Sequence, residues 1–336
     1  MRPSELLRAW NKILHGETPS LSIEITRECP LRCPGCYAYG SDHLGGGVTL
    51  RELSDYKGQE LVDNVMRVVD SYQPLHLSLV GGDPLVRYRE LEQLVPLITE
   101  RGIHLQIVTS AFRVFPLAWT QNPLVNVVVS IDGLQPEHDV RRTPATYQRI
   151  LSTIAGQKVT VHCTITGQMM KRPDYLQEFV EFWSQKHEVN KIWFSIFTPQ
   201  IGDDLPEILS PQQRAQVVVD LKKLRKSYSK IDMPPEMIQQ FETPPDSPKD
   251  CIFAQTTTSI SADLTSFIGP CQFGGKPDCS QCGCAASMGL AAVGAYKLGG
   301  LLPVKWIFDL SFRIGRAMAK AQPAPLATPS PFRVLR

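Results

Sequence analysis

An α/β fold built on a mainly parallel sheet is what this sequence predicts, and three observations lead to that prediction. Apolar, β-rich runs alternate with segments of helical periodicity about six times. The chain has 336 residues, which suits one large α/β barrel or two smaller domains. Hydrophobic residues make up 43% of the chain and charged residues 20%, as in a folded globular protein. The expected strands are Leu21–Thr26, Leu75–Val80, His104–Thr109, Val125–Ile131, Val159–Thr166 and Lys191–Phe197.

Helices are expected between these strands and at both ends of the chain. Thr49 opens one helix, because Glu52 follows three residues later in a capping-box pattern. This helix is expected to run on through the apolar residues at a spacing of three and four, which are Leu61, Val62, Val65, Met66 and Val69. The Ser-Pro pair at 210–211 indicates the start of another. Amphipathic helices are expected within residues 1–20 and over Val304–Lys320. We expect both to cover the core, and binding to a membrane surface is the alternative.

Charge and apolar patterning limit the classes of partner. Lys and Arg total 35 and Asp and Glu total 33, so the formal charge of +2 argues against a nucleic-acid-binding protein. No run reaches the ~18 apolar residues of a membrane span. The first residues lack the apolar core of a signal peptide, which predicts a cytoplasmic protein. In a reducing compartment, the nine cysteines favour metal or redox chemistry over disulfides.

Three cysteines follow the first expected strand directly. Cys29, Cys33 and Cys36 lie in the segment CPLRCPGCYAYG with the spacing C-x3-C-x2-C. Three thiolates on one loop can each bind one iron of a cubane cluster and leave the fourth iron open to a small molecule, whereas electron carriers normally close that site with a fourth thiolate. The alternative is a zinc site, for which His43 or a more distant residue would supply the fourth ligand.

Polar motifs also follow the second and fourth expected strands. Gly81-Gly82-Asp83-Pro84 allows a sharp turn and close approach of the backbone to a ligand, although it is also an ordinary turn sequence. The fourth strand ends in the sequence SIDG at 130–133, with His138, Arg141 and Arg142 beyond it. A serine and a carboxylate at a strand end suit ribose hydroxyls and an ammonium group. Taken alone, this segment is better explained as a capped turn with solvated charges.

Together, and in this order, the three motifs resemble the radical S-adenosylmethionine (radical SAM) superfamily over about Leu21 to Thr198. The resemblance implies an α/β fold, a partial (β/α)6 TIM-like barrel. It also implies a [4Fe–4S] cluster held by Cys29, Cys33 and Cys36, with S-adenosylmethionine (SAM) on the fourth iron. Reductive cleavage of SAM would then give a 5′-deoxyadenosyl radical, with a reducing partner such as flavodoxin or ferredoxin.

The resemblance further implies a set of cofactor-binding residues. Gly81, Gly82 and Asp83 would contact the methionine amino group, with Asp83 one methylene shorter than the glutamate of the family's GGEP motif. Ser130 and Asp132 are candidates for the ribose or methionine end of SAM, and the backbone near Tyr37 and Phe197 for the border of the adenine.

A second cysteine group lies near the C-terminus. Its members are Cys251, Cys271, Cys279, Cys282 and Cys284, spaced C-x19-C-x7-C-x2-C-x-C. This group resembles the SPASM or twitch extension of radical SAM enzymes, which implies one auxiliary [4Fe–4S] cluster with one thiol left over. A structural zinc site is the alternative. Cys163 lies inside an expected strand, and we expect it to be a small buried hydrophobic residue.

These observations divide the chain and leave the substrate open. The expected parts are an N-terminal amphipathic helix at 1–20, the radical SAM core barrel at 21–232, a cysteine-rich extension with a C-terminal amphipathic helix at 233–322, and a proline-rich tail at 323–336. The resemblance favours hydrogen abstraction from a peptide, leading to crosslinking, oxidation or epimerisation. The alternatives are the same chemistry on a lipid or small metabolite at a membrane surface, and a non-enzymatic iron–sulfur or zinc protein.

Overall fold

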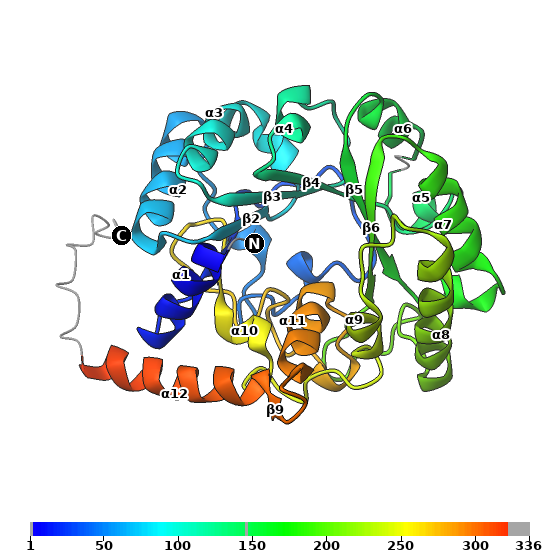
Figure 1. Cartoon of the computed structure of the whole chain (residues 1–336). Coiled ribbons are helices and arrows are strands. Elements are labelled where there is room, and N and C mark those ends of the chain that lie inside the picture. The colour runs from blue at the N-terminus through cyan, green and yellow to red at the C-terminus, as the bar shows by residue number, and fades with distance from the viewer. Residues whose placement is uncertain (1–2, 145–146, 322–336) are drawn as a thin grey trace.

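A computed structural model of the chain describes residues 3–144 and 147–321. Its main feature is a seven-stranded parallel sheet with the strand order β6-β5-β4-β3-β2-β1-β7 (Figure 1). The strands are β1 (Ser20–Glu24), β2 (His76–Val80), β3 (His104–Thr109), β4 (Val125–Ser130), β5 (Val159–Ile165), β6 (Val189–Ile196) and β7 (Thr257–Ile260). All six strands expected from the sequence are therefore confirmed, with ends that move by at most two residues. The curved sheet is the partial-barrel α/β fold that the sequence predicts.

Helices cover both sides of the sheet. Figure 1 shows α2 to α8 around its outer side and α10 and α11 on the opposite side. The helices are α1 (Pro3–Leu14), α2 (Gly58–Tyr72), α3 (Tyr88–Thr99), α4 (Leu117–Gln121), α5 (Glu137–Arg141), α6 (Tyr147–Ile154), α7 (Tyr175–Gln185), α8 (Pro211–Ser227), α9 (Pro235–Gln239), α10 (Ile252–Thr256), α11 (Ala285–Ala295) and α12 (Val304–Ala321). Ser210 caps α8 in a capping box with Gln213, as the sequence predicts. Cys163 is buried in the core, as expected.

The seventh strand was not expected. Strand β7 comes from the cysteine-rich segment and pairs in parallel with β1, from Ser20↔Thr257 to Ile23↔Ile260. Its four residues, TTSI, are too short and too polar to stand out as a strand in the sequence. The part of the chain after 232 therefore contributes a strand to the same sheet as the core strands.

The helix expected from Thr49 is wrong in its extent. The capping box between Thr49 and Glu52 is present, but it caps a single 3₁₀ turn at Leu50–Glu52. Helix α2 begins only at Gly58. The intervening residues are tied to the end of β1 instead. The Asp55 carboxylate accepts hydrogen bonds from the Thr26 hydroxyl and from the amide of Arg27.

Helices α1 and α12 pack against each other at one edge of the molecule (Figure 1). Ile13, Phe308 and Phe312 form a small core with Ile252 of α10. Both terminal helices thus cover core residues, as expected. No helix within residues 3–144 and 147–321 is long and apolar enough to cross a bilayer. The proline-rich tail expected at 323–336 lies outside the described residues.

Candidate functional site

The first cysteine loop is held firmly against the barrel. Cys29, Cys33 and Cys36 all lie on the loop after β1, and each is partly buried with a free thiol. Gly35 adopts a left-handed backbone with φ +62°, and a β-carbon there would lie 2.9 Å from the Phe197 ring. Only glycine allows both the left-handed backbone and the close approach to the Phe197 ring, so Gly35 determines the path of the loop.

Burial dominates the electrostatics of these thiols. It raises the pKa of Cys29 to about 12, and it also raises the pKa of Cys33 and of Cys36. The guanidinium of Arg142 lowers the pKa of the latter two but does not offset burial. Three thiolates side by side therefore need a positively charged partner, which is the role of iron in a cluster. Among the described residues, no group of three or more Cys, His, Asp or Glu is arranged to hold a single metal ion.

The glycine pair after β2 closes tightly on this loop. Gly81 has φ +122°, and a β-carbon at Gly82 would lie 2.0 Å from the carbonyl oxygen of Glu28, which directly precedes the first cysteine. The amide of Gly82 donates to the carbonyl of Thr26 at 2.8 Å, and the amide of Asp83 donates to that of Glu28 at 2.9 Å. The turn therefore fixes the start of the cysteine loop through backbone contacts.

The side chain of Asp83 points into the protein. Its carboxylate is buried and accepts hydrogen bonds from the Thr109 hydroxyl at 2.7 Å, the Ser110 amide at 2.8 Å and the Leu85 amide at 3.0 Å. These bonds tie the end of β2 to the end of β3. In this arrangement Asp83 positions the turn, and contact of its carboxylate with the methionine amino group stays a prediction.

A buried charge cluster stands at the end of β4. Asp132 accepts a hydrogen bond from Arg142 at 2.9 Å and pairs with Arg141 at 3.2 Å, and its other oxygen accepts the Thr164 amide at 2.9 Å. Although burial alone would raise it, the two guanidinium groups lower the pKa of Asp132 to about 2. Ser130, two residues earlier in the chain, is buried at the end of β4. The expectation that the charges after this strand are solvated is wrong, because Asp132 holds both arginines against the barrel.

A cavity of about 310 Å³ opens between this cluster and the first cysteine loop. It is lined by Pro34 of the loop, by Asp132 and Arg141 after β4, by Thr166 and Gln168 after β5, and by Glu207. Arg141 spans the cavity wall, since it donates to the Pro34 carbonyl at 3.0 Å and lies 3.5 Å from Glu207. The cavity joins the carboxyl ends of the strands to the cysteine loop, the place where ligands bind in such sheets. Sequence reasoning missed Glu207, which follows no recognisable motif.

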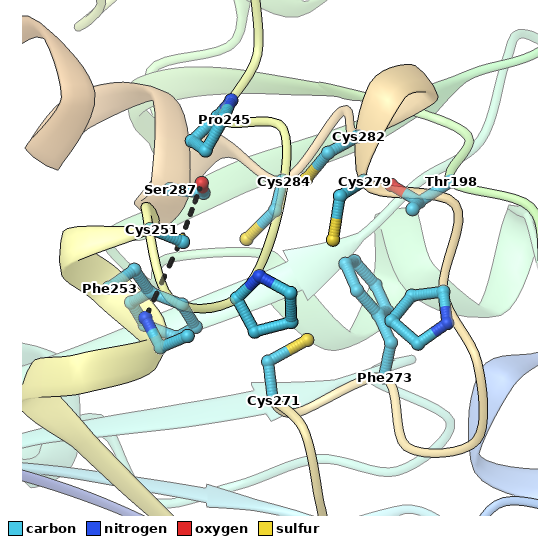
Figure 2. Close-up of a pocket in the computed structure, with 13 residues that line it drawn as sticks. Thr198, Pro245, Cys251, Phe253, Cys271, Phe273, Cys279, Cys282, Cys284 and Ser287 are labelled. Atoms are coloured by element: carbon cyan, nitrogen blue, oxygen red, sulfur yellow. Dashed lines mark hydrogen bonds between the residues drawn. The ribbon is translucent and has the colours of Figure 1, made fainter.

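All five C-terminal cysteines line one further pocket. Their sequence positions span 34 residues, yet Figure 2 shows the sulfur atoms of Cys271, Cys279 and Cys284 directed into a common space, with Cys251 and Cys282 beside it. These residues come from the start of α10, the loop after β7 and the segment that leads into α11. The structure therefore unites the whole group that the sequence set apart.

The surroundings of these five thiols differ. Cys251 Sγ lies 3.2 Å from the Ser287 hydroxyl, and Gln272 donates to Cys284 Sγ at 3.2 Å. Burial raises the pKa of Cys271 to about 12 and that of Cys279 to about 11. As at the first loop, the donor set is thiol-rich and lacks an internal disulfide.

A buried polar network lies between the two cysteine groups. Glu24 accepts a hydrogen bond from Ser261 at 2.6 Å and lies 2.9 Å from His43 Nε2, while His43 Nδ1 lies 3.2 Å from the Phe273 carbonyl. Tyr37 packs edge-on against Phe273 at 5.3 Å, so it faces the second group and does not line the 310 Å³ cavity. Both ring nitrogens of His43 are therefore engaged within this network. The signal in the sequence that could have revealed this network is Glu24, an acidic residue in the buried strand β1.

Comparison with known proteins identifies the larger part of this site. Residues 23–182 match the family model described as the Radical SAM superfamily. This segment is a radical SAM domain. The matched range contains the three-cysteine loop, the glycine turn after β2 and the Asp132 cluster. The radical SAM domain implies SAM and a [4Fe–4S] cluster, and it argues against the non-enzymatic alternative.

The individual relatives of this chain are distant. An S-adenosylmethionine-dependent nucleotide dehydratase of Psychrobacter lutiphocae is 26% identical over 125 residues, which is 36% of this chain and 39% of that protein. Streptococcus suis SuiB, bound to its precursor peptide SuiA, has a similar fold with a TM-score of 0.55 and 14% identity, over 76% of this chain and 60% of SuiB. Native anSMEcpe with bound AdoMet gives a TM-score of 0.55 and 15% identity, over 76% of this chain and 75% of anSMEcpe. At these identities the two structures establish a shared fold.

Proposed function

We propose that this chain cleaves SAM reductively and uses the resulting radical to abstract hydrogen from a peptide substrate. The observation that carries the proposal is the three-cysteine loop after β1, which lies inside the matched radical SAM range and beside a cavity at the strand ends. When bound there, the cluster and SAM would supply a 5′-deoxyadenosyl radical. Flavodoxin or ferredoxin would supply the electron.

The residues of this chain would have distinct tasks. Cys29, Cys33 and Cys36 would hold the cluster, and the tight turn at Gly81 and Gly82 would offer backbone groups to the methionine end of SAM. The 310 Å³ cavity would receive the rest of SAM or part of the substrate, with water excluded by the walls of the barrel.

Beside that cavity, Asp132 would orient Arg141 and Arg142, so that their charges face the carboxylate of SAM or of the substrate. Ser130 lies at the same strand end and is a further candidate for SAM. Tyr37 would act from the other side of the loop, where it packs against Phe273. Asp83 would act through the turn, because its carboxylate is directed inward.

The second cysteine group would hold an auxiliary [4Fe–4S] cluster in the manner of a SPASM or twitch extension. The donor set supports this, because five thiols line a single pocket and a cubane cluster needs four of them. The pocket lies on the segment after 232, which is the extension expected from the sequence. The fifth thiol would remain free beside the cluster.

A peptide is the favoured substrate, and a small metabolite or lipid is the second candidate. SuiB carries its precursor peptide in a structure with the same fold, which supports peptide crosslinking, oxidation or epimerisation. The name of the Psychrobacter lutiphocae relative refers to a nucleotide, which supports a small molecule. Transfer of deuterium from a labelled candidate peptide to 5′-deoxyadenosine would decide for the peptide, and absence of transfer from every peptide offered would favour the small molecule.

The radical step itself has a direct test. Under anaerobic conditions with dithionite, the reconstituted wild type is expected to form 5′-deoxyadenosine from SAM. Cys33→Ala is expected to abolish this activity, whereas Cys163→Ala keeps it, because Cys163 is a buried core residue that belongs to neither cysteine group. Cys279→Ala is expected to lower the bound iron by about four atoms per chain while SAM cleavage persists. No 5′-deoxyadenosine from a fully loaded wild type would refute the proposal.

A further inference from the structure

The exposed apolar side chains of this protein are concentrated in one region. Among the described residues, nine of the 18 large hydrophobic side chains that are exposed lie between Val293 and Met318. They belong to the end of α11, to the hairpin of β8 (Lys297–Leu298) and β9 (Leu302–Pro303), and to α12. A soluble monomer rarely exposes so many apolar side chains together, so this region is expected to contact a partner.

The geometry of α12 directs these side chains outward. Phe308 and Phe312 occupy one side of the helix and pack against α1 and α10. Trp306 and Leu310, which are 64% and 58% exposed, begin a row that recurs every four residues on the other side. Figure 1 shows α12 and the hairpin along the rim of the molecule, with α10 and α11 on the inner side. The row of exposed apolar side chains therefore lies on the side of α12 that is opposite to this packing.

The hairpin extends the same ridge. Its tip carries Leu301, which is 88% exposed. Leu298 and Leu302, on either side of Leu301 in the hairpin, are also exposed. The amide of Val304 donates to the Tyr296 carbonyl at 2.9 Å, so the base of the hairpin is fixed to the first turn of α12. The apolar hairpin and the apolar row of the helix therefore form one surface, which we call the α12 ridge (the exposed apolar residues from 293 to 318).

The charge of this segment points to one kind of partner. Residues 293–319 hold four basic side chains and one acidic one, so the segment has a charge of +3 in a chain of total charge +2. Lys297, Arg313 and Arg316 are exposed, and Asp309 pairs with Lys305 at 3.1 Å. An apolar row with tryptophan and flanking basic residues suits an anionic bilayer surface, where the apolar row enters the headgroup boundary.

We propose that the α12 ridge binds the surface of an anionic lipid bilayer without crossing it. Two copies of this chain facing each other through the ridge would oppose the same excess of positive charge, which disfavours self-association. A bilayer surface also accommodates an exposed helix face, whereas an extended peptide binds in a groove. Ile252 follows Cys251 of the second cysteine pocket in the chain and belongs to the same small core as Phe308 of α12, so the ridge and that pocket share a supporting core.

Cosedimentation of the full-length, anaerobically purified protein with vesicles tests this proposal. Wild type is expected to bind vesicles of phosphatidylcholine mixed with phosphatidylserine, to bind phosphatidylcholine alone far more weakly, and to dissociate as salt rises. Leu310→Asp is expected to weaken binding about tenfold or more. The matched control is Val219→Asp on α8, where the side chain is 59% exposed, and it is expected to bind as wild type does.

Charge and fluorescence give independent readings. Each of Lys297→Gln and Arg313→Gln is expected to weaken binding to the anionic vesicles about fivefold, whereas Lys223→Gln on α8 changes nothing. Vesicles are expected to shift the tryptophan emission of wild type to the blue, and Trp306→Phe is expected to lose that shift.

Three results would overturn the proposal. The first is a wild type that stays in the supernatant with both kinds of vesicle. The second is equal loss of binding in Leu310→Asp and Val219→Asp. The third is a wild-type dimer in solution that Leu310→Asp separates, which would assign the ridge to a second copy. None of these results depends on SAM cleavage, so failure here is distinguishable from failure of the proposed radical chemistry.

Discussion

Gly82→Ala is expected to destabilise the protein strongly, because the added methyl group has no room. A β-carbon at this position would lie 2.0 Å from the carbonyl oxygen of Glu28, where ordinary contact begins at 3.4 Å. The segment after β2 and the segment after β1 would have to separate by about 1.4 Å. Two backbone hydrogen bonds join these segments, from the Gly82 amide to the Thr26 carbonyl and from the Asp83 amide to the Glu28 carbonyl. Overpacking costs about 1–3 kcal/mol and two lost hydrogen bonds about 1 kcal/mol each. The expected loss in free energy of unfolding is therefore about 3–5 kcal/mol.

Urea unfolding of the purified variants measures this loss. Gly289→Ala is the matched control, because it lies inside α11 with Met237 Sδ 3.7 Å away, an ordinary contact. It is expected to stabilise the protein by about 0.5–1 kcal/mol through helix propensity. Gly82→Ala is also expected to reduce the iron content, since the same turn fixes the start of the first cysteine loop. A Gly82→Ala variant within about 0.5 kcal/mol of wild type would refute the close packing described for this turn.

Three further predictions concern the buried charges. Asp83→Glu, which installs the glutamate of the GGEP motif, is expected to cost about 1–3 kcal/mol in urea unfolding, because the carboxylate site is filled by the ends of β2 and β3; equal stability would show unused space. Arg142→Gln is expected to cost about 2–4 kcal/mol at neutral pH, because the buried Asp132 loses an ion-pair partner, and no change would mean that Arg141 suffices. Burial, with Arg142 beside it, holds the pKa of His138 at about 4, below its ordinary 6.5. The unfolded chain therefore binds the proton more readily, and stability falls by about 3 kcal/mol as pH drops from about 6.5 to 4. His138→Gln is expected to flatten that part of the urea profile, and an unchanged slope would assign the acid sensitivity to other groups.

The sequence predicts the strands well and the connecting segments less well. Strand β3 matches its predicted ends, and its first four residues alternate between polar and apolar. The helix expected at Thr49 is broken because a tertiary contact of Asp55 draws the chain across the sheet, and no local pattern reveals such a contact. Strand β7 was not predicted, because its four residues show no strong preference for a strand. It is held in the sheet by its pairing with β1.

The candidate site shows the same division between local pattern and distant partner. The spacing of Cys29, Cys33 and Cys36 indicates metal chemistry, because spacing along the chain can be seen directly in the sequence. Arg142 looks like a surface charge in the sequence because nothing nearby reveals that Asp132 will be buried beside it. Glu207 lies far along the chain and reaches the cavity only through the fold.

The pairing of β1 with β7 explains how the two cysteine groups come to lie on one edge of the sheet. In parallel strands the carboxyl ends meet at the same edge, so the loop with Cys29 and the loop with Cys271 leave the sheet side by side. The register also places Ser261 within 2.6 Å of Glu24, and a shift of one residue would turn Glu24 to the opposite face. Since Glu24 also holds His43, which reaches the backbone two residues beyond Cys271, the strand register sets the relative position of both cysteine loops. A change that moves one group is therefore expected to disturb the other, even though no cysteine is shared.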